Sequence, residues 1–298
     1  MPNTSRALVL TAGSLGDAIL TLPALQELQK RASVTVAGTS SYHQLGAPAL
    51  GVDQVIPLEP LLQSLHVGES LHPDFWKGFS EVFFFFKDGD PKVAARLSEL
   101  PHLKLHQIKL HQPSETFENF LKKERWAGDF WLELVNPDHA PNSVKNARLV
   151  LSDAVNERGT YLVLSSGYHS PFIVHPGSGS RAKNAPLSFF RKAAQSVTSE
   201  VEKEVLVVWG EAEMSYLKEI QEAFKGLERV RLLPEPLPLP DLIALLTQAC
   251  GYLGNDSGIT HLASACGVKT FAVFNTTDSK IWGPQESIIL AAMQTLYK

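Results

Sequence analysis

Three glycine-containing loops hold the residues of this chain that are best suited to chemistry. The first reads Gly13-Ser14-Leu15-Gly16-Asp17 and follows the short apolar segment 7–10. Glycines let a backbone approach a ligand closely, and a helix start offers free N–H groups. Asp17, ionised beside such a helix start, could take a proton from an attacking hydroxyl, or it could only cap the helix. The spacing does not fit the dinucleotide-binding fingerprint, so the loop alone leaves both interpretations open.

The second loop spans residues 175–183 and reads HPGSGSRAK. Its glycines, hydroxyls and two cations after an apolar segment are typical of an anion-binding loop, although a solvated loop with surface cations has the same composition. Lys183 is a compact point charge that could neutralise a diphosphate leaving group. The loop does not fit the Walker A pattern.

The third loop spans residues 254–261 and reads GNDSGITH. It joins a strand end to a helix start, where Ser257, Thr260 and backbone N–H groups could bind an anion. Asp256 could accept hydrogen bonds from sugar hydroxyls or cap the helix. His261 could contact a phosphate or be a buried, satisfied histidine.

Repeated strand–loop–helix units must position these loops. Apolar runs predict strands, and apolar residues at helical spacing predict helices. Repeated units of this kind predict parallel sheets with helices on both faces, in two Rossmann-like domains joined around 140–165. Ligands of such sheets bind outside the carboxyl ends of the strands. The predicted strands are 7–10, 34–37, 54–58, 83–86, 104–110, 172–175, 205–209, 229–233, 251–254 and, as the last, 270–274; the predicted helices are 18–30, 91–100, 114–126, 186–201, 211–224, 239–249 and 258–266.

Composition excludes several classes of protein. The 298 residues are 44% hydrophobic and 19% charged, which is not the composition of a disordered chain. The net charge of −4, shared equally between the two halves, argues against a nucleic-acid partner. The two cysteines argue against a disulfide scaffold and for a cytoplasmic setting. No apolar run approaches 18 residues, so any membrane contact should be peripheral.

Together the three loops resemble glycosyltransferase family 9, the ADP-heptose:lipopolysaccharide heptosyltransferases. The resemblance covers the C-terminal half almost throughout and the N-terminal half to about Gly38, with little between about 60 and 140. The matching motifs are Gly13-x-x-Gly16-Asp17 with Pro23-Ala24-Leu25, His175-Pro176-Gly177 with Lys183 and Pro186, the block 254–263, and the strand 271–274 with Trp282-Gly283-Pro284.

This resemblance implies a GT-B fold, an α/β architecture of two Rossmann-like domains whose parallel sheets face a central cleft. Residues 1–155 would bind the acceptor and residues 156–298 the nucleotide sugar, with the last helix packing back on the first domain. The implied reaction is inverting, metal-independent transfer of a heptose or similar sugar from an ADP-sugar, with ADP-heptose the expected donor. The implied acceptor is a lipopolysaccharide core or a related glycolipid or glycan. No cofactor is expected beyond this co-substrate.

The resemblance also implies a role for each matching residue. Asp17 takes the position of the catalytic base, and Asp256 the position that meets the donor sugar. Glu213 takes the ribose position by its spacing from Gly210, with Glu211 as the alternative. The diphosphate-binding positions are Lys183, Ser257, Gly258, Thr260 and His261; Gly13, Ser14, Gly16, Ser178 and Arg181 would lie near the sugar and phosphates; no residue is assigned to a metal.

The chain departs from the family at two places. Asn184 and Ala185 stand where the family has a tryptophan, and Phe83 to Lys87 stand where it has an Asp-x-Gln-like segment. Because the second departure falls on the acceptor side, an alternative function is a nucleotide-sugar-binding protein that has lost transfer or uses other substrates. An NAD-dependent Rossmann enzyme fits poorly, since the dinucleotide fingerprint is absent.

Overall fold

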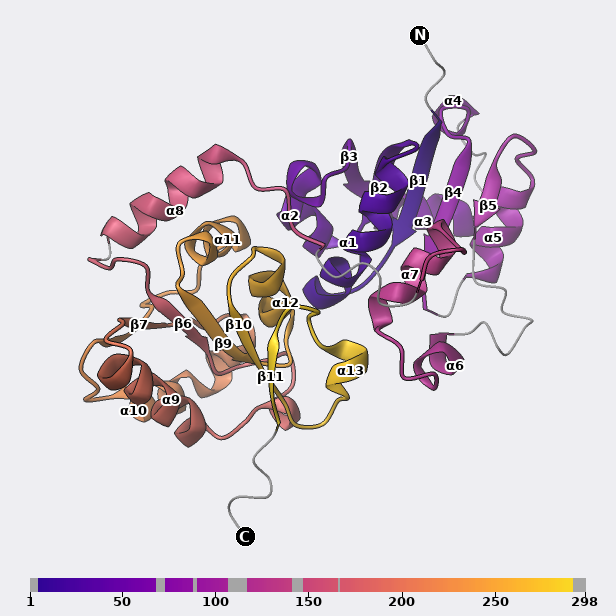
Figure 1. Cartoon of the computed structure of the whole chain (residues 1–298). Helices are drawn as coiled ribbons and strands as arrows, with labels where there is room; N and C mark the ends of the chain where they lie inside the picture. The colour runs from indigo at the N-terminus through magenta and orange to yellow at the C-terminus, as the bar shows by residue number, and fades with distance from the viewer. Residues whose placement is uncertain are drawn as a thin grey trace. The chain divides into compact units, whose positions relative to one another are not determined.

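The structure, a computed structural model, describes residues 5–67, 73–87, 90–106, 117–140, 147–165 and 167–291. The chain forms two compact units, Met1–Val150 and Leu151–Lys298 (Figure 1). The expected boundary at 155/156 lies inside the first helix of the second unit, α8 (Asp153–Ser165).

The first unit is built on a parallel sheet with the strand order β3-β2-β1-β4-β5. β1 lies between β2 and β4, with Leu8 opposite both Thr35 and Val82. The strand order therefore reverses at β1: β2 and β3 lie on one side of it, and β4 and β5 lie on the other. The strands are β1 (Arg6–Thr11), β2 (Ser33–Gly38), β3 (Gln54–Pro57), β4 (Glu81–Phe85) and β5 (Lys104–His106).

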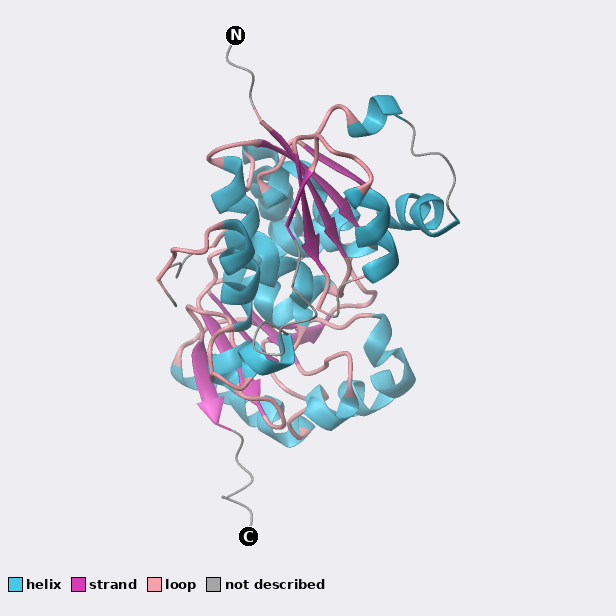
Figure 2. Cartoon of the chain, turned by 90° about the vertical axis from the view of Figure 1, so that its right-hand side faces the viewer, coloured by secondary structure: helices cyan, strands magenta, loops and turns pink. Residues whose placement is uncertain are grey.

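Both faces of this sheet are covered by helices (Figure 2), as a parallel sheet requires. On one face, Leu8, Leu10 and Phe84 share a core with α3 and α5. On the other, α1 packs against α7, and Phe85 stacks on Trp131 of α7. The helices are α1 (Leu15–Gln29), α2 (Ser40–Leu50), α3 (Leu58–Val67), α4 (Pro73–Trp76), α5 (Pro91–Ser98), α6 (Phe117–Leu121) and α7 (Ala127–Val135).

The second unit repeats this design with six parallel strands in the order β11-β10-β9-β6-β7-β8. Val174, Val207 and Leu253 form a core with α9 and α10 on one face, and α12 packs on β9 and β10. The strands are β6 (Phe172–His175), β7 (Val205–Val207), β8 (Val230–Leu232), β9 (Gly251–Asn255), β10 (Thr270–Phe274) and β11 (Ile288–Ala291); the further helices are α9 (Leu187–Glu200), α10 (Leu217–Phe224), α11 (Leu239–Thr247), α12 (Gly258–Ala265) and α13 (Ser279–Trp282), with 3-10 turns η2 (Arg181–Lys183) and η3 (Glu211–Tyr216).

The expectation that 270–274 is the last strand is wrong. β11 follows it and pairs in parallel with β10, with Phe271 opposite Ile288. Its four residues lie at the sheet edge, and Ile288 is 45% exposed, so the segment lacks the long buried run that marks the central strands.

Some expectations fall on residues beyond the described ranges. They are the strand over 107–110 and the helix start over 114–116. Within the described ranges, no helix has both the length and the apolar composition needed to cross a membrane.

Candidate functional site

Each sheet has a point where the strand order reverses, and the three loops predicted from the sequence lie at these points. In the first unit β1 is flanked by β4, and in the second unit β6 is flanked by β9. Loops that leave such neighbouring strands diverge to opposite faces and form the usual ligand site of an open α/β sheet. Two of the three loops, those after β6 and β9, therefore meet in the second unit, and the third follows β1 in the first.

Asp17 is fixed at the start of α1. Its Oδ2 accepts hydrogen bonds from the N–H and the hydroxyl of Ser14, each at 2.9 Å, as in one half of a capping box. Gly13 has φ +144°, and a Cβ there would lie 2.5 Å from Cβ of Asp17, so the loop needs glycine. Gly16 lies in the first turn of α1. Asp17 is thus a capping residue, but this role leaves its Oδ1 for another partner.

That partner is Lys87, the last residue of the segment Phe83 to Lys87 and not one of the predicted site residues. Its Nζ lies 2.7 Å from Oδ1 of Asp17. Burial alone would raise the pKa of Asp17, but the hydrogen bond and charge of Lys87 and the two bonds from Ser14 outweigh it, so the pKa is lowered. The carboxylate is ionised at neutral pH, as a general base must be.

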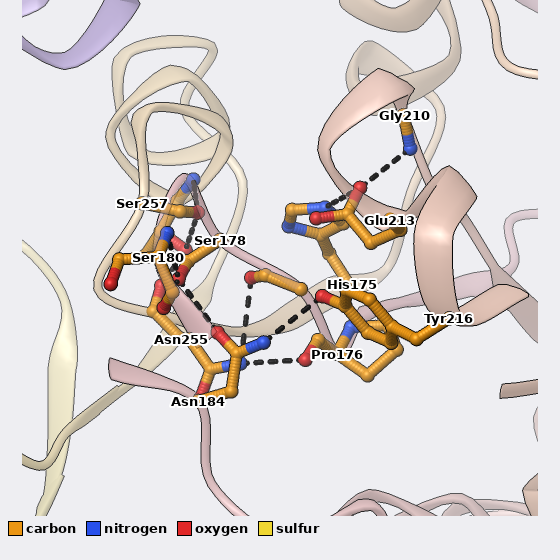
Figure 3. Close-up of polar contacts among 12 residues, drawn as sticks. His175, Pro176, Ser178, Ser180, Asn184, Gly210, Glu213, Tyr216, Asn255 and Ser257 are labelled. Atoms are coloured by element: carbon orange, nitrogen blue, oxygen red, sulfur yellow. Dashed lines mark hydrogen bonds and ion pairs between the residues drawn. The ribbon is translucent and has the colours of Figure 1, made fainter. Parts of the chain in front are cut away.

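In the second unit, Asn255 joins the loop after β6 to the loop after β9 (Figure 3). This asparagine is fully buried at the end of β9. Its Nδ2 donates to the carbonyl of Pro176 at 2.8 Å, and its Oδ1 accepts from the N–H of Ala185 at 2.8 Å. Because both ends of the amide are used, the two loops are held in one register.

Lys183 and Asp256, expected to meet the diphosphate and the donor sugar, form an ion pair in this site. Lys183 Nζ lies 2.9 Å from Oδ2 of Asp256, and the hydroxyl of Thr277 donates to the same oxygen at 2.6 Å. The Asp256 side chain is buried, whereas that of Lys183 is 38% exposed. The lysine can therefore turn to an incoming anion while Thr277 keeps Asp256 in place.

The start of α12 supplies the predicted phosphate-binding turn. Ser257 caps the helix by accepting from the N–H of Thr260 at 3.3 Å, and Gly258 is the first helical residue. The hydroxyl of Thr260 donates to the carbonyl of Asn255, so it has a structural partner. His261 is buried in the same helix. The N-terminus of α12 is therefore a helix end capped by Ser257, and helix N-termini are common phosphate-binding sites.

Glu213 is buried beneath the loop after β6, with an exposed fraction of 2% (Figure 3). Its Oε2 accepts from the N–H of Gly210 at 2.7 Å and lies 3.4 Å from Nε2 of His175. Burial alone would raise the pKa of Glu213, but the hydrogen bond and charge interaction with His175 and the N–H of Gly210 lower it overall. Glu211, the alternative, is exposed.

Two buried atoms of this pair have no hydrogen-bond partner within the described part of the chain. They are Oε1 of Glu213 and Nδ1 of His175. A buried carboxylate oxygen without a donor costs free energy, and a sugar hydroxyl is one group that would satisfy it.

Asn184, which replaces the family's tryptophan, links the loop to η3. It accepts from the hydroxyl of Ser178 at 2.6 Å and donates to the hydroxyl of Tyr216 at 3.0 Å. Arg181 stacks on the Tyr216 ring, 4.3 Å from its centroid, and pairs with Glu219 at 2.7 Å. Ser178 is therefore buried and engaged, while Arg181 lies at the surface beside it.

Comparison with known proteins shows the family and the fold. The sequence model of glycosyltransferase family 9 (heptosyltransferase) matches residues 148–296, half of the chain. The structure is similar to that of a family 9 glycosyl transferase from Veillonella parvula DSM 2008, at TM-score 0.75 and 19% identity over 98% of this chain and 87% of that chain. No curated protein matches the sequence.

Two heptosyltransferases of E. coli have the same fold. ADP-heptose lps heptosyltransferase II is similar at TM-score 0.71 and 18% identity over 96% of this chain and 90% of that chain. Heptosyltransferase WaaC, solved with ADP, is similar at TM-score 0.68 and 17% identity over 96% and 93%. Two parallel-sheet α/β units with these structural neighbours show a GT-B fold, and the family model identifies a glycosyltransferase. The chain belongs to glycosyltransferase family 9, the heptosyltransferases.

Proposed function

We propose that this chain transfers a heptose or a similar sugar from an ADP-sugar to a lipopolysaccharide core or a related glycan, with inversion and without a metal. The observation that carries the proposal is the site of the second unit, where Lys183, Asp256 and the N-terminus of α12 lie at one switch point. A cation, a helix end and a buried carboxylate are the groups that a diphosphate and a sugar require.

The donor is recognised in three parts in this proposal. Lys183 turns from Asp256 to the diphosphate and, with N–H groups of the α12 turn, neutralises the charge that develops on the leaving ADP. Asp256, held by Thr277, accepts hydrogen bonds from the sugar hydroxyls. Oε1 of Glu213 accepts a hydrogen bond from a ribose hydroxyl and so gains the partner that it lacks. Because Glu213 is buried, the loop after β6 must open for this contact. Glu211, the alternative, is exposed and would need no such opening.

The first unit supplies the base. The acceptor hydroxyl oxygen forms the new bond to the anomeric carbon while the bond from that carbon to the diphosphate oxygen breaks. ADP leaves with the electron pair of the broken bond, and Oδ1 of Asp17 takes the proton of the hydroxyl. A positioned base of this kind contributes about 10²–10⁴-fold to the rate.

The setting of the reaction is part of the proposal. A glycolipid acceptor of the proposed kind favours an enzyme in the cytoplasm, in peripheral contact with the inner face of the cytoplasmic membrane. The mildly acidic charge gives no support for a nucleic-acid partner.

A binding panel followed by a turnover assay tests this function. ADP should raise the thermal unfolding temperature more than UDP, GDP or NAD does, and ADP-heptose with an extracted core acceptor should release ADP. ADP binding without turnover would favour the alternative, a nucleotide-sugar-binding protein without transfer. Stabilisation by NAD but not by ADP would contradict both.

A further inference from the structure

Lys87 lies beside the proposed base because of the strand order. It follows the end of β4, and Thr11 at the end of β1 lies opposite Phe85 of β4. The loops after these strands therefore start side by side, and two residues 70 positions apart meet at 2.7 Å. The ammonium also lies 5.3 Å from the centre of the Phe117 ring, a cation–π contact that favours the same placement.

The two oxygens of Asp17 are used differently. Oδ2 accepts two hydrogen bonds from Ser14, which is the usual capacity of a carboxylate oxygen. Oδ1 accepts one hydrogen bond from Lys87 and can accept a second. Oδ1 is therefore the oxygen that can meet an acceptor hydroxyl, and Lys87 is the side chain that orients it.

The titratable groups on the helices α2 and α7 do not supply a positive charge to Asp17 in place of Lys87. From α2, Tyr42 is buried and its hydroxyl bonds to Thr11 and Thr21. Burial raises the pKa of Tyr42 to about 12, so it is neutral at physiological pH. His43 of α2 is exposed. On α7, the acidic residues Asp129 and Glu133 both pair with Arg125.

We propose that Lys87 is a positioning residue for transfer, which keeps Oδ1 of Asp17 ionised and in one orientation. The inference rests on the proposed function, because it gives Asp17 the role of base. Without the ammonium, the half-buried carboxylate would keep its burial, which disfavours the charged form, and would lose its strongest hydrogen bond. Its protonation would then move to higher pH, and its orientation would depend on Ser14 alone.

The first arm of the test needs no substrate. Carbon-13 NMR of the full chain labelled at the aspartate carboxyls follows the titration of Asp17, with its signal assigned by its loss in Asp17→Asn. The titration midpoint should move to higher pH in Lys87→Met and return towards the wild-type value in Lys87→Arg. Lys77→Met is the matched control, since Lys77 pairs with Asp74 at 3.4 Å on the surface of the same unit. Its midpoint should equal that of the wild type.

The second arm measures turnover of ADP-heptose with an extracted core acceptor across pH. The acid limb of kcat should move to higher pH in Lys87→Met and be restored by Lys87→Arg, with KM for the donor unchanged. An unchanged midpoint or an unchanged acid limb in Lys87→Met overturns the inference while wild-type turnover still supports the proposed function. No turnover by the wild type overturns the proposed function, whatever the NMR titration shows, and with it the role of Lys87 in transfer.

Discussion

A methyl group added at Gly177 should damage the proposed donor site, whereas the same change at Gly179 should not. A Cβ at Gly177 would lie 2.0 Å from Oε1, 2.2 Å from Cδ and 2.4 Å from Cγ of Glu213. A Cβ at Gly179, two residues along the same loop, would have no atom within 4 Å. Neither glycine has a φ in the left-handed region, so the two substitutions differ in space and not in backbone strain.

The size of the effect follows from this overlap. Carbon atoms in contact are normally about 3.5–4.0 Å apart, so the carboxylate or the loop must move by more than 1 Å. Glu213 cannot turn away freely, because it is held by Gly210 and His175. Overpacking of this kind costs about 1–3 kcal/mol. At about 2–4 °C for each kcal/mol, the unfolding temperature should fall by roughly 2–12 °C.

ADP binding should weaken together with the loss of stability. The loop after β6 carries both Lys183 and the carbonyl groups that accept hydrogen bonds from Asn255. A loss of about 1.4 kcal/mol would weaken ADP binding about tenfold. Thermal unfolding and calorimetric titration with ADP should be measured for the wild type, Gly177→Ala and Gly179→Ala. Gly179→Ala should match the wild type or gain up to about 1 kcal/mol from the stiffer unfolded chain. Wild-type stability and ADP affinity in Gly177→Ala, or equal damage in both variants, would show that the overlap with Glu213 does not limit this loop.

Three further predictions concern the second unit. Thr277→Val removes the hydroxyl that donates to Asp256 at 2.6 Å. Calorimetry should then show ADP-heptose binding weakened about tenfold and ADP binding little changed. Equal losses for both ligands would contradict the proposed contact between Asp256 and the donor sugar. Gly159→Ala places a Cβ 2.1 Å from the carbonyl oxygen of Ala244, so α8 and α11 must move apart. The free energy of unfolding, measured in urea, should fall by about 1–3 kcal/mol. No loss would show that the two helices can shift without cost. Because the pKa of Glu213 is lowered on folding, its ionised form stabilises the fold above the ordinary value of 4.5 and this advantage is lost as pH falls through the folded value. The difference in unfolding temperature between wild type and Glu213→Gln should therefore be larger at pH 7 than below about pH 4.5, and a difference that persists unchanged under acid would contradict this.

The central elements of both sheets could be predicted because each begins with a buried apolar run and ends in a glycine loop. β1, β6 and β9 have this pattern, and the predicted helices 18–30, 186–201 and 258–266 agree with α1, α9 and α12, which follow these three strands. The helix α2 was not predicted, since it contains Pro48 and Gly46, which has φ 78°, and both disfavour a regular helix. The helix α8 was not predicted either, because it buries only Gly159 and Val163 and therefore lacks a clear apolar stripe.

The contacts of the site could be predicted only in part. Lys183 and Asp256 were both assigned to the donor from their motifs, and the structure brings them together. Their pairing depends on β6 and β9 being neighbours, which local patterns do not reveal. The same holds for Thr277, which follows β10, and for Lys87, which follows β4. The useful signal in both cases is a polar residue just after a strand that flanks a predicted site loop.

The most direct test of the account compares Asp17→Asn with the wild type in one assay of donor binding and transfer. Asparagine keeps the size of the side chain and an oxygen for the bonds from Ser14, but it cannot take a proton. ADP affinity should be unchanged, because the proposed donor site lies in the second unit. The wild type should add one heptose to an extracted core acceptor, detected by mass, and the variant should be slower by about 10²–10⁴-fold. Transfer at the wild-type rate by Asp17→Asn would contradict the account.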